Sequence, residues 1–144
     1  MVGQLFGFLK QSKKNKYKVL VVEDNPVDQA FMVKTLQKNN YAVFSASDGY
    51  SGIQMAVDHC PDIIILDFLL PDIDGVGVCT SLKKMEKTRD IPVVFVSILQ
   101  NGEIMLKSYE AGAHNFICKP FNGRELIKEV AFTIEDMQAS IFSR

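Results

Sequence analysis

The amino-acid sequence predicts an α/β protein built on a doubly wound parallel sheet. Five short apolar runs alternate with five segments whose apolar residues recur at helical spacing. The run at residues 63–66 is continuously apolar, with no polar residue on either face. A strand of this kind is buried on both faces, which is typical of a parallel sheet covered by helices on each side. Right-handed crossovers between such strands give a three-layer sandwich.

The order of the segments along the chain supports this fold class. Strands are expected at residues 18–24, 41–46, 62–67, 91–97 and 114–118. Helices are expected over residues 26–39, 51–58, 76–85, 102–111 and 123–140. Asn25 suits the capping position before the first of these helices, and Pro26 is tolerated in its first turn. Gly112 is expected to end the fourth helix.

The first 16 residues differ from the rest of the chain. Their apolar residues lie at helical spacing and are followed by four lysines, an order that does not fit a secretory signal. This leader is either frayed or a short amphipathic helix that docks on a partner, on its own domain or weakly on a membrane surface. Residues 17–144 are expected to form one domain, because no linker interrupts them and their number suits a single core.

Composition excludes several classes of protein. The net charge is -1, so no overall positive field favours direct binding to nucleic acid. Cys60, Cys79 and Cys118 are too widely spaced for a zinc site, and reduced thiols are the ordinary state inside a cell. No apolar stretch reaches the roughly 20 residues of a membrane span. We therefore expect a cytoplasmic protein with no transmembrane segment.

Functional side chains follow four of the predicted strands at the point where each strand ends. Glu23 and Asp24 end the first strand, and Asp67 ends the third. Ser97 ends the fourth strand, and Lys119 follows the fifth. The carboxyl ends of parallel strands meet at one edge of an open sheet, where ligands bind. Three carboxylates gathered there need positive charge beside them, and oxygen ligands favour Mg²⁺, with Mn²⁺ as a substitute.

This set of groups suits a carboxylate that accepts a phosphoryl group. Asp67 would attack phosphorus, while the cation and Lys119 neutralise the charge on the phosphoryl oxygens. Ser97 can donate a hydrogen bond to one of those oxygens. Each side chain alone has an ordinary explanation, as a helix cap, a surface lysine or a strand-end serine. Their shared sheet edge is what favours a functional site.

The same residues resemble the response-regulator receiver domains of two-component signalling. The resemblance covers roughly residues 17–140. Its motifs stand in the family's order on the predicted strand ends: Glu23-Asp24, Asp67, Leu70-Pro71, Asp74-Gly75, Ser97, Phe116 and Lys119-Pro120. Their joint occurrence is far more specific than any one of them.

The resemblance implies a particular fold and a particular chemistry. The fold would be flavodoxin-like, with five helices and a five-stranded sheet of order 2-1-3-4-5, an order that receivers share with flavodoxin. Asp67 would be phosphorylated by a histidine kinase or a histidine phosphotransfer protein. Asp24, Asp67 and the backbone carbonyl of Leu69 would bind Mg²⁺, and Glu23 would act through water.

The resemblance also implies a signalling domain rather than an enzyme. Ser97 and Lys119 would contact the phosphoryl group, Phe116 would be the switch aromatic, and the Lys119-Pro120 bond would be cis. The fourth helix, fifth strand and last helix would form a face that changes on phosphorylation. Apolar residues on the fourth helix would suit a partner or a second copy, giving a phosphorylation-dependent homodimer.

The output of such a domain is left open by the sequence. No DNA-binding, cyclase or kinase segment follows residue 140, so the chain is either a stand-alone receiver or a piece of a longer protein. The cognate kinase and the downstream target are not encoded in any motif of the sequence.

Two residues depart from the family pattern. Ile98 stands where the family commonly has a small residue, and Leu69 is apolar and cannot orient a water molecule. Two other function classes remain open. A Mg²⁺-dependent aspartyl-phosphate phosphatase usually carries a second aspartate where this chain has Leu69. A receiver-like docking module would need no phosphorylation at all.

Overall fold

A computed structural model describes residues 16–99 and 101–142 of the chain. Its strands are β1 (Lys18–Val22), β2 (Ala42–Ala46), β3 (Ile63–Asp67), β4 (Val93–Ser97) and β5 (Asn115–Cys118). All pair in parallel in one sheet of order β2-β1-β3-β4-β5. The helices are α2 (Pro26–Lys38), α3 (Gly49–His59), α4 (Gly75–Lys84), α5 (Gly102–Glu110) and α6 (Gly123–Phe142). The expected fold class and strand order are confirmed.

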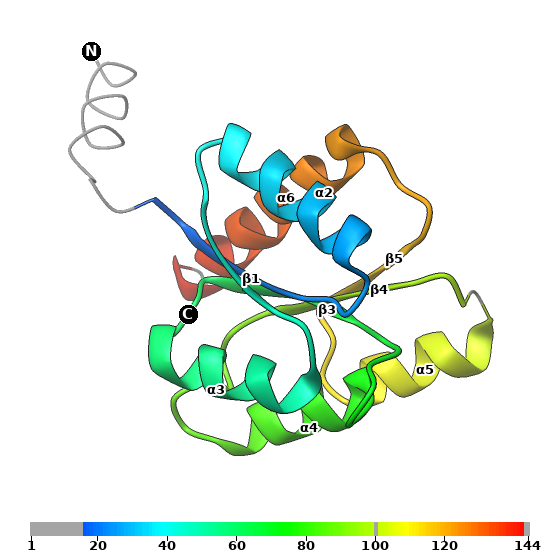
Figure 1. The fold of residues 1–144 in the computed structure, drawn as a ribbon. Helices are drawn as coiled ribbons and strands as arrows, with labels where there is room; N and C mark the ends of the chain where they lie inside the picture. Colours follow the sequence, from blue (N-terminus) through cyan, green and yellow to red (C-terminus); the bar gives the residue numbers. More distant parts are fainter. Residues whose placement is uncertain (1–15, 100, 143–144) are drawn as a thin grey trace, which may run out of the picture.

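The helices cover both faces of the sheet, so the domain has three layers (Figure 1). On one face, Leu20, Ile64 and Phe95 belong to a buried cluster that includes residues of α3 and α4. On the other face, the neighbouring strand residues pack with buried side chains of α2 and α6. Alternate residues of each central strand therefore enter different cores, which explains why these strands are apolar without interruption.

Element boundaries differ from the expected ones by a few residues. Helix α3 begins at Gly49, earlier than residue 51, because Asp48 caps it by accepting a hydrogen bond from the Ser51 N–H. Helix α5 ends at Glu110 with Ala111 as its cap, and Gly112 follows in the left-handed region at φ 105°. A glycine there avoids the strain that a side chain would impose.

Strand β3 lies at the centre of the sheet, between β1 and β4. Its last residue, Asp67, is in register with Val96 of β4, and Leu66 is in register with Val22 of β1. The residues that follow β1, β3 and β5 consequently lie at one edge of the sheet. Apart from Lys16, the predicted leader falls on residues 1–15, outside the described part of the chain.

No helix among the described residues is both long enough and apolar enough to cross a membrane.

Candidate functional site

The turn after β1 holds two carboxylates at the carboxyl edge of the sheet. Glu23 is wholly buried, whereas Asp24 is exposed. Asn25 ends the turn, and its side-chain oxygen accepts hydrogen bonds of 3.0 Å from the N–H groups of Val27 and Asp28. This cap fixes where α2 begins, and it turns the chain directly after the two acidic residues.

Asp67 lies at the end of β3, with 6% of its surface exposed. Its Oδ1 accepts a hydrogen bond of 3.0 Å from the backbone N–H of Leu69. Its Oδ2 lies 3.2 Å from the Nζ of Lys119. The carboxylate is thus oriented by one backbone donor and one positive charge, and it forms part of the lining of an open pocket.

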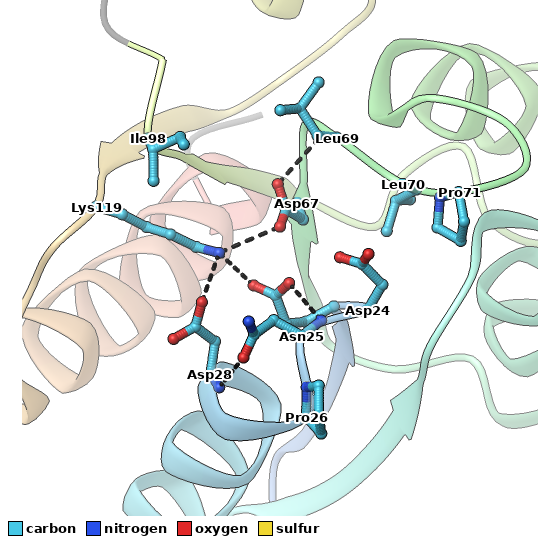
Figure 2. Close-up of a pocket in the computed structure, with 11 residues that line it drawn as sticks. Asp24, Asn25, Pro26, Asp28, Asp67, Leu69, Leu70, Pro71, Ile98 and Lys119 are labelled. Carbon is cyan, nitrogen blue, oxygen red and sulfur yellow. Dashed lines mark hydrogen bonds and ion pairs between the residues drawn. The ribbon is translucent and has the colours of Figure 1, made fainter.

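Lys119 reaches the acidic cluster from the end of β5, on the side of Asp67 opposite to Asp24 (Figure 2). It follows β5, where its backbone N–H donates to the Ser97 carbonyl at 2.8 Å, and the Lys119-Pro120 peptide bond is cis as expected. Its ammonium group donates to Glu23 and, at 3.2 Å each, to Asp28 and Asp67. One lysine therefore contacts three carboxylates from three different segments.

The pKa values of Glu23 and Lys119 are both raised, but for different reasons. Burial raises the pKa of Glu23 to about 7, and the hydrogen bond and charge of Asp67 add to the rise. The ion pair with Lys119 acts in the opposite direction but is outweighed. For Lys119, burial lowers the pKa, yet the hydrogen bond to Glu23 and the nearby carboxylates raise it above its ordinary value overall. The lysine therefore stays charged at neutral pH.

Comparison with known proteins identifies the family to which this site belongs. A family model described as "Response regulator receiver domain" matches residues 19–131, which include Glu23, Asp67 and Lys119. The chain belongs to the response regulator receiver domains. The resemblance seen in the sequence is thereby confirmed, and with it a place in two-component signalling.

Individual relatives agree with this family. The receiver domain is 34% identical over 113 residues to the DNA-binding dual master transcriptional regulator RpaA of Synechocystis, which covers 78% of this chain and 47% of RpaA. It is 30% identical over 125 residues to a histidine kinase of Formosa agariphila, 87% of this chain and 9% of the kinase. The chain spans about half or less of the length of the curated relatives it matches.

Solved structures give the same picture of the fold. The chemotaxis protein CheY4 of Vibrio cholerae superimposes with a TM-score of 0.78 at 26% identity, covering 81% of this chain and 97% of that one. The receiver domain of a Francisella response regulator also superimposes with a TM-score of 0.78, at 26% identity over 84% of this chain and 98% of its own.

The receiver's acidic residues form a cluster that could hold a metal ion. Glu23, Asp24 and Asp67 each offer a carboxylate oxygen, and the three oxygens lie within 4.8 Å of one another. The donors are all oxygens, which suits a hard divalent cation. Leu69, whose carbonyl is the fourth expected ligand, lines the same pocket.

Two expected site residues lie apart from the pocket lining. Ser97 is buried, and its Oγ accepts a hydrogen bond of 3.1 Å from the Leu99 N–H. Phe116 is 9% exposed and belongs to the same buried cluster as Phe95 and Ile104. The Phe116 ring is therefore packed inside the receiver domain.

Sequence reasoning missed Asp28, which contacts Lys119 from the first turn of α2. Asp28 stands four residues after Asp24, at the start of the helix that the Asn25 cap begins. One helical turn of spacing from an acidic strand end was the signal that could have found it.

Proposed function

We propose that Asp67 accepts a phosphoryl group from a histidine kinase or a histidine phosphotransfer protein. A carboxylate oxygen of Asp67 attacks phosphorus, the phosphorus–nitrogen bond to the donor histidine breaks, and that nitrogen keeps the electron pair. The domain that performs this transfer comprises residues 17–144, with residues 1–16 as a leader. It is a signalling domain, which assists its own phosphorylation, rather than an enzyme with a separate substrate.

The observation that carries this proposal is the placement of Asp67. The carboxylate lines an open pocket, so a donor can approach it, and Lys119 lies 3.2 Å from one of its oxygens. Lys119 keeps its positive charge because neighbouring carboxylates raise its pKa. It can therefore stabilise the negative charge of the phosphoryl oxygens. Ser97, at the end of the adjacent strand, would donate a hydrogen bond to another of these oxygens.

The acidic cluster supports a requirement for Mg²⁺, or Mn²⁺ in its place. Asp24, Asp67 and the Leu69 carbonyl would be direct ligands, and Glu23 would act through water. The cation would neutralise negative charge around the transferring phosphoryl group. Because only three protein ligands would be direct, about half of its octahedral coordination shell would remain water, and binding would be weak.

We further propose an output face formed by α5, β5 and α6. Met105 and Tyr109 of α5 are exposed there, and Ile104 is partly buried beside them. The side chain of Tyr109 donates to Asn115 of β5 at 3.2 Å, and Asn115 donates to Glu129 of α6 at 2.7 Å. Because these contacts join the three elements, a shift of α5 would alter the whole face. A downstream protein or a second copy of the chain would bind it.

Incubation with acetyl phosphate and Mg²⁺, followed by mass spectrometry, tests the central proposal. The chain should gain one phosphoryl group at Asp67, and Asp67→Asn should gain none. Asp24→Asn should raise the Kd for Mg²⁺ about tenfold or more and slow phosphorylation in parallel. An unchanged Kd for Mg²⁺ in that variant would contradict the metal assignment.

The same experiment separates this function from the two alternatives. A stable gain of mass supports the signalling domain. Steady turnover of small phosphate esters would instead indicate an aspartyl-phosphate phosphatase. No modification of an intact, folded chain would leave a docking module that works without phosphorylation.

A further inference from the structure

The ammonium group of Lys119 has no N–H donor to spare for a new partner. An ammonium has three N–H groups, and here three carboxylates accept from it: Glu23, Asp28 and Asp67. Phosphorylation removes the charge of the Asp67 carboxylate and frees one donor, so a phosphoryl group that accepts a second hydrogen bond from Lys119 must displace Glu23 or Asp28. These two partners differ greatly in what their displacement would cost.

Glu23 is the partner that Lys119 can least readily release. The Glu23 side chain is 0% exposed and that of Lys119 is 12% exposed, so their separation would leave a buried carboxylate without its counter-charge. Breaking a buried pair by removing one partner is strongly unfavourable. The Asp67 side chain, which is 9% exposed, carries the phosphoryl group itself and does not compete with it for Lys119.

Asp28 can be released at little cost. Its side chain is 47% exposed, so water can replace Lys119 as its hydrogen-bond donor. Its backbone N–H is held by the Asn25 cap, and Asp28 is one of the residues that line the pocket. Figure 2 shows Asp28 meeting Lys119 from the side of α2, away from Asp67.

We infer that Asp28 is a positioning residue that occupies one donor of Lys119 in the resting domain and gives it up to the phosphoryl group. It acts through Lys119 and touches no reacting atom. The inference rests on the proposed phosphorylation of Asp67. Its consequence is that Asp28 competes with the phosphoryl group, so it weakens the phosphorylated state rather than strengthening it.

Beryllofluoride with saturating Mg²⁺, titrated into the full chain and followed by ¹⁹F NMR, tests this competition. Asp28→Asn should lower the Kd for beryllofluoride about two- to fivefold, the range expected for losing an exposed ion pair. Asp58→Asn is the matched control, because it removes the same charge from an exposed residue of α3 whose carboxylate accepts from Gln54. The control should leave the Kd unchanged.

A measurement on the unmodified chain tests the same inference without depending on the folding of a variant. The side-chain carboxyl ¹³C signal of Asp28 should shift when beryllofluoride binds, because Lys119 leaves it, whereas that of Asp48 at the α3 cap should not. An unchanged Asp28 signal alongside shifted Asp67 signals would overturn the inference, as would an equal or higher Kd in Asp28→Asn. Absence of any bound fluoride in the unmodified chain would count against the proposed phosphorylation itself.

Discussion

Asp72 accepts a hydrogen bond of 2.7 Å from the backbone N–H of Gly49, although 23 residues separate them in the sequence. Its second carboxylate oxygen accepts from the Tyr50 N–H at 2.9 Å. The loop after β3 is thereby joined to the first turn of α3, whose unpaired N–H groups favour a carboxylate. Since this loop carries Leu69 and Leu70 of the pocket, the contact bears on the site as well as on stability.

Replacing Asp72 with alanine should lower the free energy of unfolding and weaken Mg²⁺ binding. Partial desolvation acts to raise the pKa of Asp72, but the N–H groups of Tyr50 and Gly49 outweigh it and lower the pKa to about 2 from 3.8. A lowered carboxyl pKa means that the stabilisation is full above pH 3.8 and is lost as the pH falls toward 2.

Urea denaturation at several pH values checks this assignment. The difference in stability between wild type and Asp72→Ala should be constant near neutral pH and should shrink below pH 4. Asp58→Ala, which removes an exposed carboxylate elsewhere on α3, should change stability little. A difference that stays constant down to pH 2 would show that the contact does not depend on the charge of Asp72.

Gly75 is required by the close approach of α4 to the end of β3. A Cβ at this position would lie 2.5 Å from the Asp67 carbonyl oxygen and 2.7 Å from Cε1 of Phe95. Gly75→Ala should therefore destabilise the domain by about 1–3 kcal/mol and displace Asp67. Gly102→Ala is a suitable control, since a Cβ there meets nothing within 4 Å and alanine favours a helix. Thermal unfolding of both variants would reject the idea if Gly75→Ala were no less stable than Gly102→Ala.

The pattern of apolar runs along the sequence predicted most of the fold and much of the site. Continuous apolar runs predicted the parallel sheet, and the strand ends predicted that Asp67 and Lys119 lie at one edge of it. What the sequence did not reveal depends on side-chain geometry. The contact of Asp28 with Lys119 and the hydrogen bond between Ser97 and Leu99 arise from loop conformations that residue spacing does not determine.

The stability of the metal-free domain should fall as the pH rises from about 4.5 to 7. Burial raises the pKa of Glu23 to about 7 from 4.5, so in this interval the folded state binds more protons than the unfolded state. The expected loss is on the order of 1–3 kcal/mol. Urea denaturation in a chelator at pH 5, 6, 7 and 8 measures it. Glu23→Gln should flatten this dependence, and an equally steep profile in that variant would assign the effect to another group.

An apolar rim should make the proposed phosphoryl group long-lived. The side chains of Leu69 and Ile98 line the pocket beside Asp67, and neither can orient water. Leu69→Glu or Leu69→Asn should speed hydrolysis of the phosphorylated domain roughly tenfold, less than a fully adapted general base provides. Leu69→Ala separates the loss of bulk from the gain of polarity. Phosphate release from acetyl-phosphate-treated protein gives the rate, and an unchanged or slower rate in the Glu and Asn variants would exclude this role.

Ser97 is the residue expected to link the phosphoryl site to the output face. Its Oγ now accepts from the Leu99 N–H, at the start of the loop that leads into α5. The hydroxyl still has its O–H to donate, and movement of Oγ toward a phosphoryl oxygen would lengthen its hydrogen bond with the Leu99 N–H. Because the Phe116 ring is already buried, we expect the loop and α5 to respond more than this ring does.

Backbone NMR with beryllofluoride and Mg²⁺ should therefore show large shifts at Leu99 and along α5, with smaller ones at Phe116. Ser97→Ala should reduce the α5 response, Ser97→Thr should retain it because the hydroxyl is kept, and Asp67→Asn should abolish it. Sedimentation under the same conditions measures whether the altered face promotes association. A ligand can shift such an equilibrium only through its different affinity for the two states. If beryllofluoride perturbs residues beside Asp67 but leaves Leu99 and α5 unchanged, Ser97 does not couple the site to this face.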